Sequence, residues 1–328
     1  MIVWLASYPR SGNTALRMLL NRVFGLETFS LYDDRTDIGE SEERARLVGH
    51  RSHGATAEEF VAQAAASDQT HYVKTHDLPP AGQDWPAIVV VRDGRSSTVS
   101  YWHYRQRFGG TAPSLEEVVA GDVMFGSWSA HVAAWLDAPL SRRLVLRYEE
   151  IATLQPETVA RIAEFLGVEP KGIPADLGFE AARKAFPEFF RGGDDSKNIA
   201  ELNAACPALF DALHARMQER LGYPSAAVQG DPGVALAAEI ARALQLRRQQ
   251  TADSMAEAHA LRAEAGALRA EAGALRGEIA ALGGRIAALT ARTAEQAMEI
   301  EGMRNSPFWK LRDATIRALG ATGLRRRG

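Results

Sequence analysis

The sequence places residue types that bind phosphate groups in a short segment near its start. Residues 7–14 read Ser-Tyr-Pro-Arg-Ser-Gly-Asn-Thr, after an apolar run at 2–6 and before an amphipathic stretch at 14–24. If the run is a strand and the stretch a helix, backbone N–H groups and the positive end of the helix dipole converge on the loop between them. An anion such as a phosphate binds at such a place. A plain strand–turn–helix connection remains the alternative interpretation.

A second segment has the same character. Arg92 follows a β-branched apolar run at 87–91, and Ser100 lies eight residues further along the chain, within a helix expected over 95–107. An arginine at the end of a strand presents a planar guanidinium fork that can hold a phosphate through two hydrogen bonds. Taken alone, this pair of residues is a weak indication of a site.

The first segment differs from the phosphate loop of the common nucleoside triphosphatases. That loop reads GxxxxGK[ST], whereas here the first glycine is absent, Arg10 precedes Gly12 and no lysine follows. The sequence therefore disfavours a P-loop-type nucleotide kinase or triphosphatase, although this class stays open as an alternative.

His76 is the residue whose chemistry could remove a proton from a substrate. It follows Lys74 and Thr75 at the end of a short strand expected over 71–74. A neutral imidazole, with an ordinary pKa near 6.5, can take a proton from a hydroxyl group at neutral pH. Taken alone, a histidine at a strand end is more often a structural residue with a satisfied hydrogen bond.

The elements that must position these residues are predicted from apolar runs and helical periodicity. Continuous apolar runs alternate with amphipathic stretches, a pattern that predicts an α/β fold with helices on both faces of a parallel sheet. Ligands bind such sheets at the carboxyl ends of the strands, where both segments and His76 fall. The expected strands are 2–6, 71–74, 87–91 and 143–148, and the expected helices are 14–24, 95–107 and 156–166.

The composition excludes several classes of protein. Of the 328 residues, 46% are apolar and 24% are charged, with a net charge of −3, so a wholly disordered chain and a globally basic nucleic-acid binder are disfavoured. Cys206 is the single cysteine, which excludes an intrachain disulfide, and the scattered histidines predict no metal site. The run at 2–6 is too short for a signal peptide and no uninterrupted apolar stretch is long enough for a membrane span, so we expect a cytoplasmic protein.

Taken together, the two segments resemble the sulfotransferase family that uses 3′-phosphoadenylyl sulfate (PAPS). The resemblance is carried by WLASYPRSGNTALRMLL at 4–20 and VVVRDGRSSTVSYWHY at 89–104, and it extends through the KTH segment at 74–76 and LRYEE at 146–150. It covers about residues 1–222. It implies a P-loop-type parallel sheet flanked by helices, PAPS as the co-substrate and no divalent metal.

The resemblance also implies a role for each candidate residue. His76 would be the base that takes the proton of the acceptor, while Lys74 and Arg10 would neutralise the transferring group and the leaving group. The cofactor contacts would come from the first segment (Arg10, Ser11, Gly12, Asn13, Thr14), from a 3′-phosphate pair (Arg92, Ser100) and, near the adenine and 3′-phosphate, from Tyr148, Arg191, Gly192 and Gly193.

Three positions depart from the family pattern. Arg10 stands where the family usually has a lysine, and Ala15 stands where many cytosolic members have a tryptophan that stacks on adenine. Gly192 stands where a basic residue is more usual. Because arginine and lysine differ in geometry, these departures affect the details of the contacts rather than the class of protein.

A helical region follows a boundary near residue 230, where Ala, Leu, Arg and Glu begin to dominate. Apolar residues recur there in a heptad pattern, and Glu at g matches Arg at e of a parallel partner helix. We therefore predict a parallel homodimeric coiled coil over 251–303, with a lone exposed helix as the alternative. The d positions are Leu261, Leu268, Leu275, Leu282 and Leu289, and the a positions are Ala265, Ala272, Ile279 and Ile286.

The last residues form a basic amphipathic tail. Residues 304–328 contain seven Lys or Arg, one acid, and the aromatic residues Phe308 and Trp309. Such a segment suits an anionic membrane surface, although docking on a dimer partner and a frayed tail stay open. The predicted organisation is a sulfotransferase domain (1–225), a linker and helix start (226–250), the coiled coil (251–303) and this tail (304–328).

The function predicted from the sequence is in-line transfer of a sulfuryl group from PAPS to a hydroxyl or amine of an acceptor, with His76 as base. A short resemblance of SPFW at 306–309 to the tails of bacterial enzymes that build surface polysaccharides favours a glycan or glycolipid acceptor. An inactive scaffold dimerised by the coiled coil is a further alternative. Aromatic residues such as Trp102, Trp128 and Trp135 could line an acceptor pocket or belong to the core. If the tail binds membrane, we expect the protein at its inner face.

Overall fold

The computed structural model divides the chain into two units, Met1–Arg248 and Gln249–Gly328. It describes residues 1–32, 38, 41–108, 112–175, 177, 180, 184 and 195–321. Three of the predicted cofactor contacts, Arg191, Gly192 and Gly193, lie outside the described residues.

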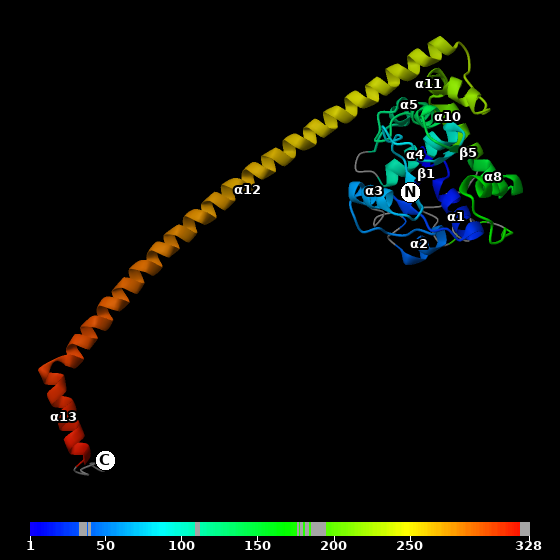
Figure 1. Cartoon of the computed structure of the whole chain (residues 1–328). Helices are drawn as coiled ribbons and strands as arrows, with labels where there is room; N and C mark the ends of the chain where they lie inside the picture. The colour runs from blue at the N-terminus through cyan, green and yellow to red at the C-terminus, as the bar shows by residue number, and fades with distance from the viewer. Residues whose placement is uncertain are drawn as a thin grey trace. The chain divides into compact units, whose positions relative to one another are not determined.

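The first unit is built around a parallel sheet of five strands in the order β2-β3-β1-β4-β5. Figure 1 labels β1 and β5 among the helices of this unit. The α/β fold expected from the sequence is therefore confirmed. The strands are β1 (Ile2–Ser7), β2 (Phe29–Ser30), β3 (His71–Thr75), β4 (Ala87–Val91) and β5 (Arg143–Arg147).

The helices of the first unit cover both faces of this sheet. Those nearest the candidate residues follow β1 and β4 directly. The described helices are α1 (Asn13–Phe24), α2 (Glu42–Val48), α3 (Ala57–Ala66), α4 (Gly94–Phe108), α5 (Leu115–Ala120), α6 (Trp128–Asp137), α7 (Tyr148–Ala152), α8 (Pro156–Leu166), α10 (Asp195–Ala205) and α11 (Pro207–Arg220), followed by α12 (Pro232–Asn305) and α13 (Pro307–Ala321).

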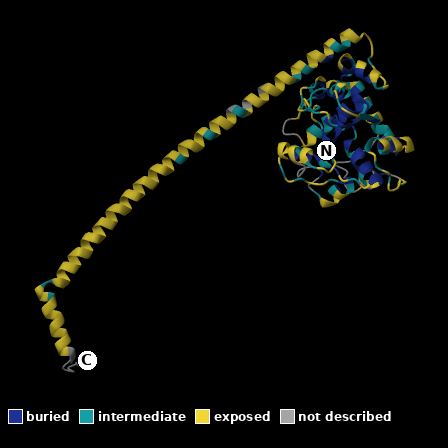
Figure 2. Ribbon diagram, in the orientation of Figure 1, coloured by how far each residue is buried: buried dark blue, intermediate teal, exposed yellow. Residues whose placement is uncertain are grey.

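Alternate residues of the strands bury against opposite layers of helices. Val3 and Leu5 of β1 pack in one cluster with α1 and α8, while Trp4 and Ala6 pack in another with α3, α4 and α6. All six residues of β1 are buried, as a central parallel strand requires. Figure 2 shows this interior as the dark core of the first unit.

The strand order creates a topological switch point between β1 and β4. The chain leaves β1 into α1 on one face of the sheet and leaves β4 into α4 on the other, as their separate clusters show. A crevice outside the carboxyl ends of two such strands is the usual ligand site of an open α/β sheet. Both segments predicted to bind phosphate begin at this point, directly after Ser7 and Val91.

The first turns of α12 belong to the first unit. Glu239, which is 7% exposed, accepts hydrogen bonds from the backbone N–H groups of Ala208 (3.2 Å) and Leu209 (2.6 Å) and so caps the start of α11. Arg242 donates to Glu116 at 3.3 Å. The start of α12 is therefore packed against α11 and α5 of the first unit.

The second unit contains the rest of α12 and α13. The heptad leucines are 53–64% exposed, and the helix continues through Gly283 and Gly284 without a break. Figure 2 shows α12 exposed along most of its length. None of the described helices combines the length and the hydropathy that a membrane span requires.

Candidate active site

The loop after β1 has two residues in the left-handed region of the backbone. Arg10 has φ 63° and Gly12 has φ 110°. Gly12 is also pressed against α7, because a Cβ there would lie 2.6 Å from Cδ2 of Tyr148. Only glycine meets both conditions without strain. The resulting tight turn directs the loop into α1, whose first residue is Asn13.

The structure brings together the two segments that were predicted to bind phosphate. Nε of Arg10 donates to Oγ of Ser100 at 3.3 Å, and the hydroxyls of Ser11 and Ser97 lie 3.1 Å apart. Arg92 donates from Nη1 to the carbonyl oxygen of Arg10 at 2.9 Å. Four of the residues selected from the sequence therefore lie together at the switch point of the sheet.

Arg92 is the buried cation of this group. The residue is 7% exposed, and its guanidinium lies 4.3 Å from the ring centroid of Tyr148. Asp195, at the start of α10, accepts hydrogen bonds from Nε and Nη2 of Arg92. The hydroxyl of Ser96 donates to the same carboxylate at 2.6 Å. A planar fork of this kind suits a phosphate as well as a carboxylate.

A second ion pair fixes the start of α4 behind Arg92. Asp93 accepts hydrogen bonds from Nε and Nη2 of Arg95 at 3.0 and 2.5 Å. Gln218 donates to Asp93 at 2.9 Å and accepts from the backbone N–H of Gly94 at 3.0 Å. Because the charge of Arg95 is paired with that of Asp93, Arg95 fixes the start of α4 and adds no net positive charge beside Arg92.

His76 is held at three of its atoms. Its Nδ1 lies 2.8 Å from the carbonyl oxygen of Ser7, and its backbone N–H donates to the hydroxyl of Tyr32 at 2.7 Å. Nε2 of His131 lies 2.8 Å from the carbonyl oxygen of His76 and donates to it. Because a carbonyl oxygen only accepts, Nδ1 of His76 carries the hydrogen and Nε2 of the neutral ring keeps its lone pair.

The surroundings keep the imidazole of His76 neutral. Burial lowers its pKa well below 6.5, the positive charge of Lys74 lowers it further, and the Ser7 carbonyl opposes these effects. The charge of Arg10 is a smaller cause in the same direction. Burial also lowers the pKa of His131, to about 4. His76 is therefore unprotonated at neutral pH and can accept a proton.

Lys74, Asn13 and Thr14 are the remaining predicted site residues that the structure describes. Lys74 is 6% exposed, and its Nζ lies 5.5 Å from the ring centroid of Tyr32. Asn13 turns its amide back toward β1 and donates to the carbonyl oxygen of Leu5 at 2.7 Å, a contact that braces the loop. Thr14 is partly exposed in the first turn of α1.

Four residues at this site are not among the catalytic and cofactor-binding residues predicted from the sequence. Ser7 acts through its backbone carbonyl, which any residue would supply, and Tyr32 and His131 reach His76 from distant elements. Asp195 follows the expected cofactor contacts at 191–193 closely in sequence, and this proximity is the one signal that could have pointed to it.

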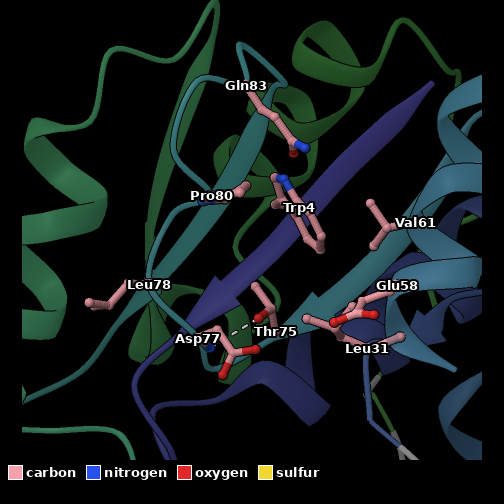
Figure 3. A pocket seen from close by; sticks show the side chains of 10 residues that line it. Trp4, Leu31, Glu58, Val61, Thr75, Asp77, Leu78, Pro80 and Gln83 are labelled. Carbon is pink, nitrogen blue, oxygen red and sulfur yellow. Dashed lines mark hydrogen bonds between the residues drawn. The ribbon is translucent and has the colours of Figure 1, made fainter.

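A mostly apolar pocket of about 250 Å³ lies beside the end of β3, the strand that precedes His76 (Figure 3). Figure 3 shows the indole of Trp4 and the amide of Gln83 pointing toward one another across it, with Thr75 and Asp77 at one side. Thr75 and Asp77 flank His76 in the chain. The lining residues are Trp4, Leu31, Ala57, Glu58, Val61, Thr75, Asp77, Leu78, Pro80 and Gln83.

Within the part of the chain that the structure describes, no three His, Cys, Asp or Glu side chains are grouped so that they could hold a metal ion. Cys206 is buried and burial raises the pKa of its thiol to about 12, so it packs as a small apolar residue.

Comparison with known proteins identifies relatives of the first unit. The family described as "Sulfotransferase domain" matches residues 2–185. The chain is 27% identical over 178 residues to mouse sulfotransferase 1B1, covering 49% of this chain and 57% of the relative. It is 26% identical over 175 residues to Arabidopsis thaliana cytosolic sulfotransferase 3, covering 50% and 52%. The matches thus span about half the length of these relatives.

The solved structures that match part of the chain include a mouse sulfotransferase. The crystal structure of mouse sulfotransferase SULT7A1 complexed with PAP is 18% identical, with a TM-score of 0.47, and the match covers 67% of this chain and 88% of that chain.

Proposed function

The chain belongs to the sulfotransferase family, whose domain matches more than half of its 328 residues, and we propose that it transfers a sulfuryl group from PAPS to a hydroxyl or amine of an acceptor. The observation that carries this proposal is the meeting of Arg10, Arg92 and Ser100 at the switch point of the sheet. When bound, PAPS supplies an activated sulfuryl group on a phosphosulfate anhydride.

The residues that lie together at the switch point of the sheet fit PAPS. The loop has two residues with left-handed backbone, Arg10 and Gly12, and it opens into the N-terminus of α1, where backbone N–H groups favour an anion. Arg92 with Ser100 would hold the 3′-phosphate, and Ser11 and Thr14 would donate to the 5′-phosphosulfate. Arg10 and Lys74 place positive charge where negative charge grows on the leaving group.

His76 is the proposed general base. Nε2 takes the proton of the acceptor, and the carbonyl of Ser7 stabilises the imidazolium that results through the hydrogen bond from Nδ1. Tyr32 and His131 hold the backbone of His76 from both sides and so fix where Nε2 points. The ring of Tyr148 packs against the guanidinium of Arg92 and so fixes its orientation.

The first experiment is a calorimetric titration of the full chain with 3′,5′-adenosine bisphosphate (PAP), the expected product, and separately with ATP and Mg²⁺. Metal-independent binding of PAP that is lost in Arg92→Ala supports the proposal. Binding of ATP with Mg²⁺ instead would favour a nucleotide kinase or triphosphatase. Binding of neither ligand would favour an inactive scaffold.

For the acceptor, we propose a glycan linked to a lipid or other apolar group. The support is the apolar pocket beside Thr75 and Asp77, which could take the apolar part while a hydroxyl is presented to His76. The test is transfer from [35S]PAPS to envelope glycolipid extracts, with free sugars and small phenols as comparisons. Labelling of small phenols alone would contradict this acceptor class.

We also propose that residues 251–303 form a parallel homodimer. The exposed heptad leucines would bury against a second copy, and Glu264 would face Arg269 of that copy as Glu271 would face Arg276. A second copy is favoured over another partner because the e and g charges complement those of this same sequence.

The tail is proposed to contact an anionic membrane at its inner face. In α13, Phe308 is 74% and Leu311 is 68% exposed, and the guanidinium of Arg312 lies 3.8 Å from the ring centroid of Trp309. Co-sedimentation with vesicles of anionic phospholipid, but not with vesicles of phosphatidylcholine, would support this contact. Equal sedimentation after deletion of 304–328 would contradict it.

A further inference from the structure

Asp195 makes a multiple contact with the second phosphate-binding segment. It accepts hydrogen bonds from Nη2 of Arg92, from Nε of Arg92 at 3.5 Å and from Oγ of Ser96 at 2.6 Å. Asn198, one turn further along α10, donates to Oγ of Ser96 at 3.2 Å and so helps to orient that hydroxyl. The carboxylate is therefore held on the same residue that would hold the 3′-phosphate.

Arg92 has one bidentate edge that an anion can use. The ring of Tyr148 lies against its face, and Nη1 donates to the carbonyl oxygen of Arg10. These contacts fix the plane of the guanidinium and turn the Nε–Nη2 edge toward Asp195. Such an edge binds a carboxylate or a phosphate through parallel hydrogen bonds, but the two anions cannot occupy it together.

The pair lies mostly out of water. The side chain of Arg92 is 9% exposed and that of Asp195 is 23% exposed. An arginine in such a place is unfavourable without an anion, because its charge has lost hydration and gained no partner. The carboxylate of Asp195 meets this need whenever no phosphate is bound.

We propose that Asp195 occupies, in the free protein, the place that the 3′-phosphate takes on Arg92, so that nucleotide binding exchanges a carboxylate for a phosphate. The inference rests on the function proposed above. Asp195 is then a specificity-determining residue, because it lowers the affinity for nucleotides that carry a 3′-phosphate. A nucleotide without this phosphate leaves the ion pair intact and has nothing to displace.

The test compares PAP with 5′-AMP, which lacks the 3′-phosphate, by calorimetry on the full-length chain and on Asp195→Asn. We expect the variant to bind PAP about tenfold more tightly, the factor that applies if Arg92 is released from Asp195 about one-tenth of the time. The affinity for 5′-AMP should stay within about twofold. The melting temperature of the free variant should fall, and PAP should raise it by more than in the wild type, because the phosphate restores a partner for Arg92.

The matched control is Glu201→Gln. It makes the same charge change on the same helix, but Glu201 pairs with Nε2 of His103 at 2.8 Å. We expect no change in the affinity for either nucleotide. If Asp195→Asn fails to fold, Ser96→Ala keeps the carboxylate and removes its 2.6 Å donor, and PAP should again bind more tightly.

Three results would overturn the inference while the proposed function stands: unchanged or weaker PAP binding in Asp195→Asn, equal tightening of PAP and 5′-AMP, or the same tightening in Glu201→Gln. Weaker binding would mean that Asp195 positions Arg92 for the nucleotide. If PAP binds neither the wild type nor folded variants, the proposed function is wrong and the inference fails with it.

Discussion

The carbonyl oxygen of Ser7 lies 2.8 Å from Nδ1 of His76, so the last residue of β1 determines which imidazole nitrogen carries the hydrogen. The parallel register of β1 and β3, in which Ala6 is opposite Thr75, brings these two residues to the same edge of the sheet. The proton acceptor of the proposed reaction is therefore positioned by backbone pairing, next to the loop that would hold the phosphosulfate.

Replacing His76 by Ala should remove transfer without removing the nucleotide. We expect the turnover number to fall by about 10²–10⁴, the usual contribution of a general base, while PAP affinity stays within about twofold. The measurements are the initial rate of transfer from [35S]PAPS and calorimetric titration with PAP. His76→Gln, which keeps a polar side chain but no base, should behave as the alanine variant does. Turnover close to wild type in both variants would exclude His76 as the base.

The pH dependence of kcat/KM should show no acid limb at 6.5. Burial and the charge of Lys74 lower the pKa of His76, so its base form persists as the pH falls from 8 through 6.5. The same lowered pKa affects stability. The contribution of His76 to the free energy of unfolding is fully present above pH 6.5, and it is lost as the pH falls from 6.5 toward the lower pKa that His76 has in the folded protein. We expect kcat/KM to stay level between pH 8 and 6.5.

Lys74→Gln is the control for this profile. It removes the positive charge that acts on His76, so the acid limb should move to higher pH, whatever the variant does to the rate itself. A wild-type limb centred on 6.5, or a limb that does not move in Lys74→Gln, would contradict the assignment of the base to His76.

Gly12→Ala should damage the loop more than an ordinary glycine replacement does. The new Cβ would meet Cδ2 of Tyr148 at 2.6 Å at a φ of 110°, so Tyr148 and the contact between its ring and Arg92 must shift. Gly167→Ala is the matched control, since Gly167 has φ 66° and nothing within 4 Å of the added atom. The control should cost about 1–2 kcal/mol of stability from its left-handed backbone.

Gly12→Ala should cost more than this control and should weaken PAP binding, whereas Gly167→Ala should leave PAP binding unchanged. Urea unfolding and calorimetry measure the two effects. Equal stability losses with equal PAP affinity in the two variants would show that the approach of Tyr148 to Gly12 has no role in the site.

The elements that carry the site were predictable because their sequence signals are local. The apolar runs at 2–6 and 87–91 became β1 and β4 within one residue at each end, and the helix predicted at 156–166 matches α8. The strand predicted at 143–148 was one residue too long, since Tyr148 begins α7, where Glu150 accepts from the backbone N–H of Arg147. The short strand β2 was not predicted, because two residues carry no periodicity.

The contacts within the site depend on distant elements and could not be read from the sequence. Tyr32 reaches His76 across 44 positions, and Asp195 reaches Arg92 across 103. The aromatic residues were equally ambiguous. Trp128 and Trp135 proved to be fully buried core residues that pack in one cluster with β1 and β4, whereas Trp102 is only partly buried.

Leu275→Lys should separate the proposed dimer, whereas Ala274→Lys should not. Leu275 stands at d and is 53% exposed in the single chain, so a dimer would bury it and a lysine there would have to be buried without a partner. Ala274 stands at c, on the outer face of the same turn, and takes the same charge in solvent.

We expect Leu275→Lys to weaken association at least about thirtyfold, equivalent to about 2 kcal/mol, in sedimentation velocity over a range of concentrations. Both variants should keep PAP binding, because the proposed nucleotide contacts lie in the first unit. A monomeric wild type at tens of micromolar, or equal dissociation of the two variants, would leave α12 as a lone exposed helix.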